Sequence, residues 1–155
     1  MAATANFALT DLKPIRPIQG WEEFWRDGQG FLRTATAAHR GRKSVFTPEI
    51  LYNIIAMAIE KFVMAALMRY GALPYNHTMK DLVNAMEETF PGAVNDIRER
   101  LIELDHYQEI CALDAFAVIA PAREEIPAML ELGSRMQELV KERIRSCSKK
   151  NEHPS

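Results

Sequence analysis

The sequence predicts an all-α protein, folded as an antiparallel up-and-down bundle of four to five helices. Apolar residues recur at helical spacing in each long segment, and no stretch alternates polar and apolar residues as a strand does. The connections between these segments are short, which makes neighbouring helices run in opposite directions. At 155 residues, of which 48% are hydrophobic, the chain is long enough to bury one core without disulfides.

We expect an extended N-terminal arm over 1–20, a single helical domain over 21–150 and a disordered tail over 151–155. The arm contains two prolines and little periodic pattern. The first helix is expected over about 20–38, where two internal glycines weaken it by about 1 kcal/mol each relative to alanine. Aromatic packing must compensate. The aromatic residues of this helix are Trp21, Phe24, Trp25 and Phe31. A basic segment, HRGRKS over 39–44, follows.

The segment from Glu49 to Tyr70 predicts a long central helix. Its apolar residues recur near the 3.6-residue period and also occupy most of the other faces, so the helix must pack on several sides. Thr47 can cap it, Pro48 suits its first position, and Gly71 can end it. One Glu-Lys pair interrupts the segment, so no apolar run reaches the roughly 18 residues of a membrane span.

Two further helical segments follow. Thr78 is expected to cap a third helix, with Asp81 as its capping-box partner, and a Pro-Gly pair then breaks the chain. The next segment, which begins AVNDIRERL, is helical by pattern through at least Ile110 and ends at the latest at Pro121. The expected inner-face residues are Leu82, Val83, Met86 and Phe90 in the third helix, then Val94, Ile97, Leu101 and Leu104.

The last helix is expected over about 123–149, with Pro127 tolerated in its first turn. The first and last helices together carry more large apolar side chains than one bundle face needs. Large apolar patches are unusual on a soluble monomer, so we expect these helices to form a homodimer interface. The side chains concerned are Trp21, Trp25 and Phe31 on the first helix and Met129, Leu132, Met136 and Leu139 on the last.

Composition favours a cytoplasmic protein without a cofactor. The formal net charge of -2 and pI near 6.1 provide no global field for nucleic acid. Cys111 and Cys147 have no metal-ligand spacing, and no signal-peptide pattern opens the chain, so we expect reduced thiols. The histidines are too scattered to indicate a metal site, and no phosphate-cradling glycine motif or serine-nucleophile motif is present.

A set of short motifs resembles the HEPN family (higher eukaryotes and prokaryotes nucleotide-binding) over roughly residues 21–145. The first motif is an alanine-rich helix with an Ile-Glu-Lys core, AIEKFVMAAL over 58–67. The later motif positions are Gly71, Pro74, His77, Leu82, Leu104, Asp105 and Tyr107. Related small members often continue with Arg-Tyr-Pro after the tyrosine, whereas this chain continues with QEICALDAF.

The resemblance implies an antiparallel helical bundle that commonly dimerises. Many HEPN proteins are ribonucleases of toxin or defence systems, others accompany a nucleotidyltransferase, and others have lost catalysis. The ribonucleases carry an arginine followed, after four to six residues, by a histidine. Arg100 and His106 have this spacing here. In a metal-independent ribonuclease the histidine would move the proton and the arginine would hold the phosphate.

Geometry argues against this catalytic pair. Residues six apart on a regular helix lie about 120° apart around its axis. Arg100 and His106 would therefore converge only across a dimer or at a helix irregularity. The alternative is that both are exposed members of a stretch rich in salt bridges.

Three further residues, Glu60, Lys61 and His77, are candidate binding residues. Glu60 and Lys61 point about 100° apart on a helix, so a structural ion pair with another helix is the competing interpretation. His77 can instead fix the entry to the third helix. The basic segment 39–44 could contact phosphate, although an isolated basic loop is more often only solvated.

These observations leave three hypotheses. The favoured one is a non-catalytic, self-associating helical module that binds a nucleotide or a partner such as a nucleotidyltransferase or an antitoxin. The second is a ribonuclease of the toxin–antitoxin or defence type, acting on RNA through Arg100 and His106. The third is a bundle that binds a small molecule between its helices.

Overall fold

The computed structural model describes residues 15–107 and 120–150, and no strand occurs in these two ranges. The all-α prediction is confirmed. The α-helices are α1 (Trp21–Arg40), α2 (Pro48–Arg69), α3 (Met79–Thr89), α4 (Arg98–Glu103) and α5 (Ile126–Lys150). The 3-10 helix η2 (Leu104–Tyr107) follows α4, and η4 (Arg123–Glu125) precedes α5. Most of the expected arm, the tail over 151–155 and Ile110 with Cys111 lie outside the described residues.

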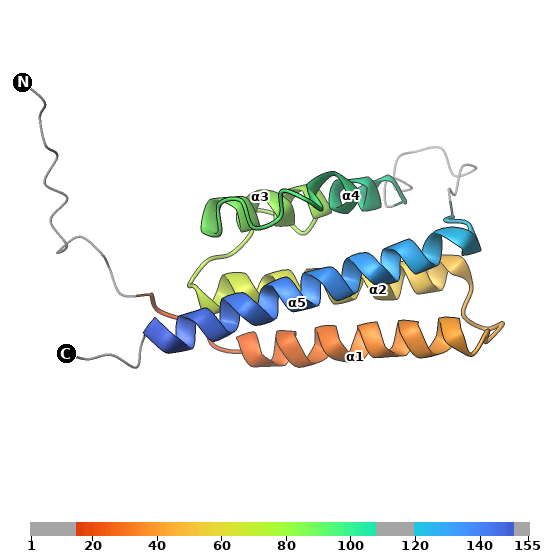
Figure 1. Cartoon of the computed structure of the whole chain (residues 1–155), viewed down its shortest axis with the longest axis horizontal. Coiled ribbons are helices and arrows are strands. Elements are labelled where there is room, and N and C mark those ends of the chain that lie inside the picture. The colour runs from red at the N-terminus through yellow and green to blue at the C-terminus, as the bar shows by residue number, and fades with distance from the viewer. Residues whose placement is uncertain (1–14, 108–119, 151–155) are drawn as a thin grey trace, which may run out of the picture.

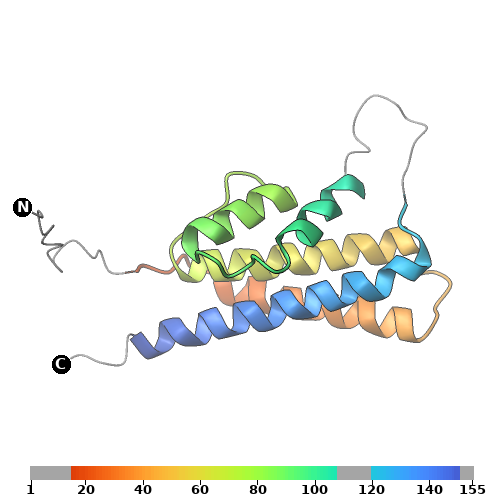
Figure 2. The same cartoon turned by 45° about the horizontal axis from the view of Figure 1, so that its top comes forward.

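Helix α2 is the central helix, as its composition predicts. The long helices α1, α2 and α5 run side by side, and α3 and α4 lie along another side of α2 (Figures 1 and 2). Helix α2 packs against α1, α5 and α3. The largest fully buried side chains of α2 are Leu51, Ile55, Ile59, Phe62, Val63 and Leu67. By length and mean hydropathy (1.7) α2 could cross a membrane, but 67% of the qualifying window is buried inside the protein, as in a core helix.

Both ends of α2 follow the sequence prediction. The Thr47 hydroxyl accepts a hydrogen bond from the Ile50 amide at 3.3 Å, and Pro48 is the first helical residue. Gly71 takes a left-handed conformation (φ 75°) just after the helix. A Cβ on Gly71 would lie 2.7 Å from the Arg16 carbonyl oxygen, because the described end of the arm packs against this turn. The arm is anchored there by the Ile18 amide, which donates to the Met68 carbonyl at 2.8 Å.

The two glycines of α1 have different surroundings. A Cβ on Gly28 would lie 2.7 Å from the Phe62 ring and 3.2 Å from the Ala58 carbonyl oxygen. Gly28 therefore lets the α1 backbone approach α2 closely. The Trp25 ring packs beside the same Phe62, with centroids 5.3 Å apart, which supplies the expected aromatic compensation. No atom lies within 4 Å of a Cβ built on Gly30, so packing does not explain that glycine.

The prediction of a long helix after the Pro-Gly pair is wrong. Residues 91–97 form successive turns, α4 spans only Arg98–Glu103, and the 3-10 helix η2 begins at Leu104. The first helical turns are replaced by β-turns, in which the Ala93 and Ile97 amides each donate to the carbonyl three residues earlier. The expected inner-face residues are nevertheless buried. These are Val94, Ile97, Leu101 and Leu104.

The apolar patch expected on α1 and α5 is not exposed, because its members pack within the chain's own core. Met129, Leu132 and Met136 are buried, and the α1 aromatic residues are half-buried against the same core. This removes the original argument for a homodimer. The exposed large apolar residues lie elsewhere. They are Ile15, Val45, Ile50, Met57, Leu73 and Tyr75.

Phe62 is fully buried at the α1–α2 contact, so replacing Phe62 by alanine should lower the free energy of unfolding by about 3–5 kcal/mol. Thermal or denaturant unfolding of Phe62→Ala beside Phe62→Leu measures this. The leucine control keeps most of the volume and should cost about 1 kcal/mol. Unchanged unfolding of Phe62→Ala would refute the assignment of α2 as the central helix.

Candidate functional site

A pocket between the α4–η2 segment and the start of α5 holds both predicted catalytic residues. Arg100 and His106 are among the residues that line this α4–α5 pocket, whose volume is about 490 Å³. The change from α-helix to 3-10 helix at Leu104 is the kind of irregularity that the sequence argument required for convergence. The structure therefore brings the two residues to one cavity within a single chain.

The chemistry of the α4–α5 pocket does not suit a phosphate. Arg100 Nη2 donates to the Ala128 carbonyl at 3.3 Å and lies 3.7 Å from a Glu131 carboxylate oxygen, so α5 already engages the guanidinium. Three carboxylates line the pocket beside this single arginine. They belong to Glu103, Glu124 and Glu125. The local charge is therefore negative when His106 is neutral, which disfavours an RNA backbone.

His106 has little of the support that a proton-transfer residue needs. Its side chain is exposed, and its contact within the described residues is an edge-on ring contact with Tyr107 at 5.9 Å between centroids. No hydrogen bond to His106 occurs in residues 15–107 and 120–150. A catalytic histidine is normally oriented by a partner on its second ring nitrogen.

Tyr107 joins η2 to the start of α5 through a carboxylate. The Tyr107 hydroxyl donates to Glu125 Oε1 at 3.0 Å, and Glu125 Oε2 accepts from the Ala122 amide at 2.6 Å. Burial raises the pKa of Tyr107 above its usual 10.0, and the nearby carboxylates of Glu125 and Glu103 raise it further. The phenol therefore stays a neutral donor at physiological pH. Its role in this geometry is structural.

Asp105 holds the N-terminus of α3, a role that the sequence analysis did not assign. Its two carboxylate oxygens accept hydrogen bonds from the backbone amides of Met79 at 2.8 Å and Lys80 at 3.0 Å. Thr78 caps the same helix as predicted, accepting from the Asp81 amide at 3.1 Å. The Asp81 carboxylate accepts a hydrogen bond from the Thr78 hydroxyl at 2.7 Å. In a capping box it would instead accept from the Thr78 backbone amide.

The three predicted binding residues do not form one site. His77 Nδ1 lies 2.7 Å from Glu60 Oε1, so these two are paired, with the His77 side chain 62% exposed. Lys61 Nζ instead lies 4.4 Å from the centre of the Phe24 ring on α1. The sequence predicts that one of Glu60 and Lys61 meets a partner on another helix. Lys61 does so at the Phe24 ring of α1, whereas Glu60 is paired with His77 on the loop before α3.

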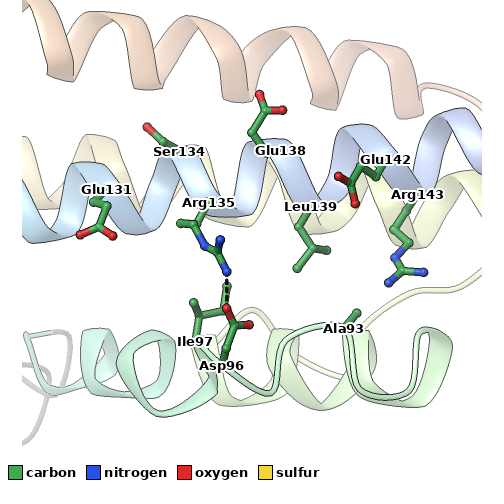
Figure 3. A pocket seen from close by; sticks show the side chains of 10 residues that line it. All are labelled: Ala93, Asp96, Ile97, Glu131, Ser134, Arg135, Glu138, Leu139, Glu142 and Arg143. Atoms are coloured by element: carbon green, nitrogen blue, oxygen red, sulfur yellow. Dashed lines mark hydrogen bonds and ion pairs between the residues drawn. The ribbon is translucent and has the colours of Figure 1, made fainter.

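A second groove lies between α5 and the turns over 91–97 (Figure 3), with a volume of about 440 Å³. Arg135 of α5 is paired with Asp96 across it. Carboxylates predominate among the charged side chains that line this groove. They are Asp96, Glu131, Glu138 and Glu142, beside Arg135 and Arg143. Like the α4–α5 pocket, the groove is acidic and unsuited to an anion.

The part of the chain that the structure describes contains no group of three or more metal-ligating side chains. Comparisons with family models, with curated proteins and with solved structures find no match to this chain. The HEPN resemblance therefore rests on the motifs quoted above. For its Leu-Asp-containing segment the structure supplies a local physical role, because Leu104 is buried and Asp105 caps α3.

Replacing Asp105 by alanine leaves two amides of α3 without their acceptor and should lower the free energy of unfolding by about 1–2 kcal/mol. Denaturant unfolding of Asp105→Ala measures this loss. Asp105→Asn keeps one acceptor oxygen and should lose less. Equal stability of Asp105→Ala and the unaltered chain would contradict the capping role.

Proposed function

We propose that this chain is a non-catalytic helical interaction module of the HEPN type, which pairs with a second copy of itself and associates with nucleotide. We further propose that its all-α fold is an antiparallel up-and-down bundle. Contacts between the start of α1 and the end of α2 support the antiparallel arrangement. Arg69, the last residue of α2, lies over the ring of Trp21, the first residue of α1, whereas Gly28 farther along α1 faces Phe62 and Ala58.

The observation that carries self-association is an uncovered apolar strip on α2. Ile50 and Met57 lie seven residues apart on one helical face, and each is 42% exposed. Ile54, between them, is only partly buried, and Val45, just before α2, is 73% exposed. Contiguous exposed apolar residues of this kind mark interaction surfaces.

Charge favours a second copy as the occupant of the α2 strip. The strip starts beside the basic turn over 39–44 and runs toward a part of the helix pair whose carboxylates outnumber its basic groups. The acidic residues there are Glu22, Glu23, Asp27 and Glu60, beside Arg26 and Lys61. A twofold axis that lays α2 across α2 of the second copy in the opposite direction brings each basic turn to an acidic end. The strip is therefore complementary to itself.

The α4–α5 pocket supports the non-catalytic part of the proposal. Arg100 is engaged by Ala128 and lies close to Glu131, and His106 lacks an orienting partner among the described residues. The carboxylates of this cavity repel a phosphodiester and so raise the free-energy cost of bringing it to Arg100 and His106. A nucleotidyltransferase or antitoxin partner and a cytoplasmic location remain predictions from the resemblance and the composition.

The ribonuclease remains the second candidate because Arg100 and His106 line one cavity. Incubation of the purified chain with mixed RNA in a chelator tests it. Our proposal predicts intact RNA, with no difference between the unaltered chain and His106→Ala. Cleavage that His106→Ala abolishes would overturn the non-catalytic assignment.

Self-association should depend on the α2 strip. Met57→Glu places a charge at its centre and should raise the dissociation constant of the dimer at least about tenfold, because a buried unpaired carboxylate is costly. Sedimentation at micromolar concentrations measures this. Ser146→Glu adds the same charge to an exposed position of α5 and should leave the dimer unchanged.

The unaltered chain sedimenting as a monomer of 17.6 kDa across that concentration range would refute self-association. A dimer that Met57→Glu does not weaken would show that another surface forms the contact.

A further inference from the structure

The basic turn between α1 and α2 forms a pocket with Arg123 of η4. This turn pocket has a volume of about 420 Å³, and its lining residues in the described chain are His39, Arg42, Ser44 and Arg123. None of these four carries a carboxylate. The turn pocket therefore differs in charge from the acidic α4–α5 pocket and from the acidic groove beside α5.

The carboxylates that neighbour Arg123 in sequence are directed elsewhere. Glu124 lines the α4–α5 pocket, and Glu125 accepts hydrogen bonds from Tyr107 and from the Ala122 amide. No salt bridge to Arg42 or Arg123 occurs within residues 15–107 and 120–150. Two guanidinium groups are thus held at one small cavity without a counter-charge from the described residues. Each can donate two parallel hydrogen bonds to one phosphate.

His39 also lines the turn pocket. Its Nδ1 has no hydrogen-bond partner among the described residues, but this atom is inaccessible to solvent and so is not part of the cavity surface. The Ser44 hydroxyl supplies one more donor at the same cavity.

Arg42 occupies the left-handed position just after the end of α1. Arg42 has a φ of 46°, in the left-handed region that favours glycine, while Gly41 beside it has an ordinary φ of -75°. The turn is held in this form by the Arg42 amide, which donates to the His39 carbonyl at 3.2 Å. A left-handed residue just after a helix is a common helix ending at which glycine is the usual residue, so Arg42 carries a conformational cost at this position.

The surface beside the turn pocket continues the basic character along α1. A groove of about 470 Å³ between α1 and α5 contains Arg33 and Arg40 and has no carboxylate among its described lining residues. Its other polar side chains are Gln29, Thr36, Ser134 and Gln137. Arg40 of this groove lies next in sequence to His39 of the turn pocket, and the two side chains point about 100° apart around the axis of α1.

We propose that the turn pocket binds a phosphate group of a nucleotide or of a nucleic-acid strand, with Arg42 and Arg123 as its principal ligands. The proposal rests on the nucleotide association included in the proposed function and gives that association a site. A strand would extend from the turn pocket along the α1–α5 groove, whereas a mononucleotide would use the turn pocket alone.

Titration of the full chain with adenosine monophosphate, followed by amide NMR and calorimetry, tests the site. Phosphate binding should shift the amides of residues 41–44 and 123, and chloride at matched ionic strength should not. Arg42→Gly should lower the affinity at least about tenfold, because charge-assisted hydrogen bonds are lost. The same variant should melt at an equal or higher temperature, since glycine relieves the strain at φ 46°.

Lys43→Gln is the matched control, because it removes one positive charge from the same turn without altering a lining residue. It should change the affinity much less than Arg42→Gly. Equal losses in the two variants, or unshifted amides at saturating adenosine monophosphate and oligoribonucleotide, would overturn the site.

A short single-stranded oligoribonucleotide distinguishes the two sources of phosphate. If the ligand is a strand, Arg33→Gln and Arg40→Gln should weaken oligoribonucleotide binding and reduce its salt dependence. If the ligand is a mononucleotide, these variants should leave adenosine monophosphate binding unchanged. Met57→Glu should not alter phosphate affinity per chain, and Arg42→Gly should not alter sedimentation, so failure of this site and failure of self-association are separable.

Discussion

The close approach of α1 to α2 at Gly28 is the constraint on which the rest of the structure depends. A Cβ on Gly28 would lie only 2.7 Å from the Phe62 ring, so either the ring or the two helices would have to shift. The present distance between the helices lets Trp25 pack beside Phe62 and positions the turn over 39–44 at the far end of the helix pair. The α2 strip is a part of this pair that α3 and α5 leave uncovered, and the turn pocket forms where Arg123 of η4 meets the turn that joins the pair.

The helical spacing of apolar residues predicts which side chains are buried more reliably than it predicts the backbone conformation of those residues. Val94, Ile97 and Leu101 are spaced by three and four residues. This spacing suits both an α-helix and a series of β-turns. All three are buried as predicted, although the first two lie in turns. The apolar spacing alone does not distinguish the two conformations. The path of the chain after the Pro-Gly break, which returns along α3, decides between them.

Candidate sites are harder to predict because their chemistry comes from residues distant in sequence. The Arg100–His106 spacing is visible in the sequence, but many of the residues that engage or surround the pair belong to α5 and η4, which are distant along the chain. The role of Asp105 likewise depends on residues that are distant in the sequence. Its amide partners at Met79 and Lys80 could not be inferred from the order of residues. Only tertiary packing reveals that this motif residue is a helix cap.

Net charge is a poor guide to partners when charges are segregated over the surface. The chain has a formal net charge of -2, which by itself argues against an anionic ligand. The fold nevertheless gathers carboxylates at the α4–α5 pocket and at the α5 groove, and leaves the turn pocket and the α1–α5 groove without them. A phosphate responds to the field within about one Debye length, roughly 8–10 Å, so it responds to the local charge. Arg42 lies within the basic region, and no carboxylate of the described residues lines the pocket beside its guanidinium. Arg42 and Arg123 come from segments about 80 residues apart in the sequence, so this local excess of positive charge is a product of the fold and is invisible in the net charge.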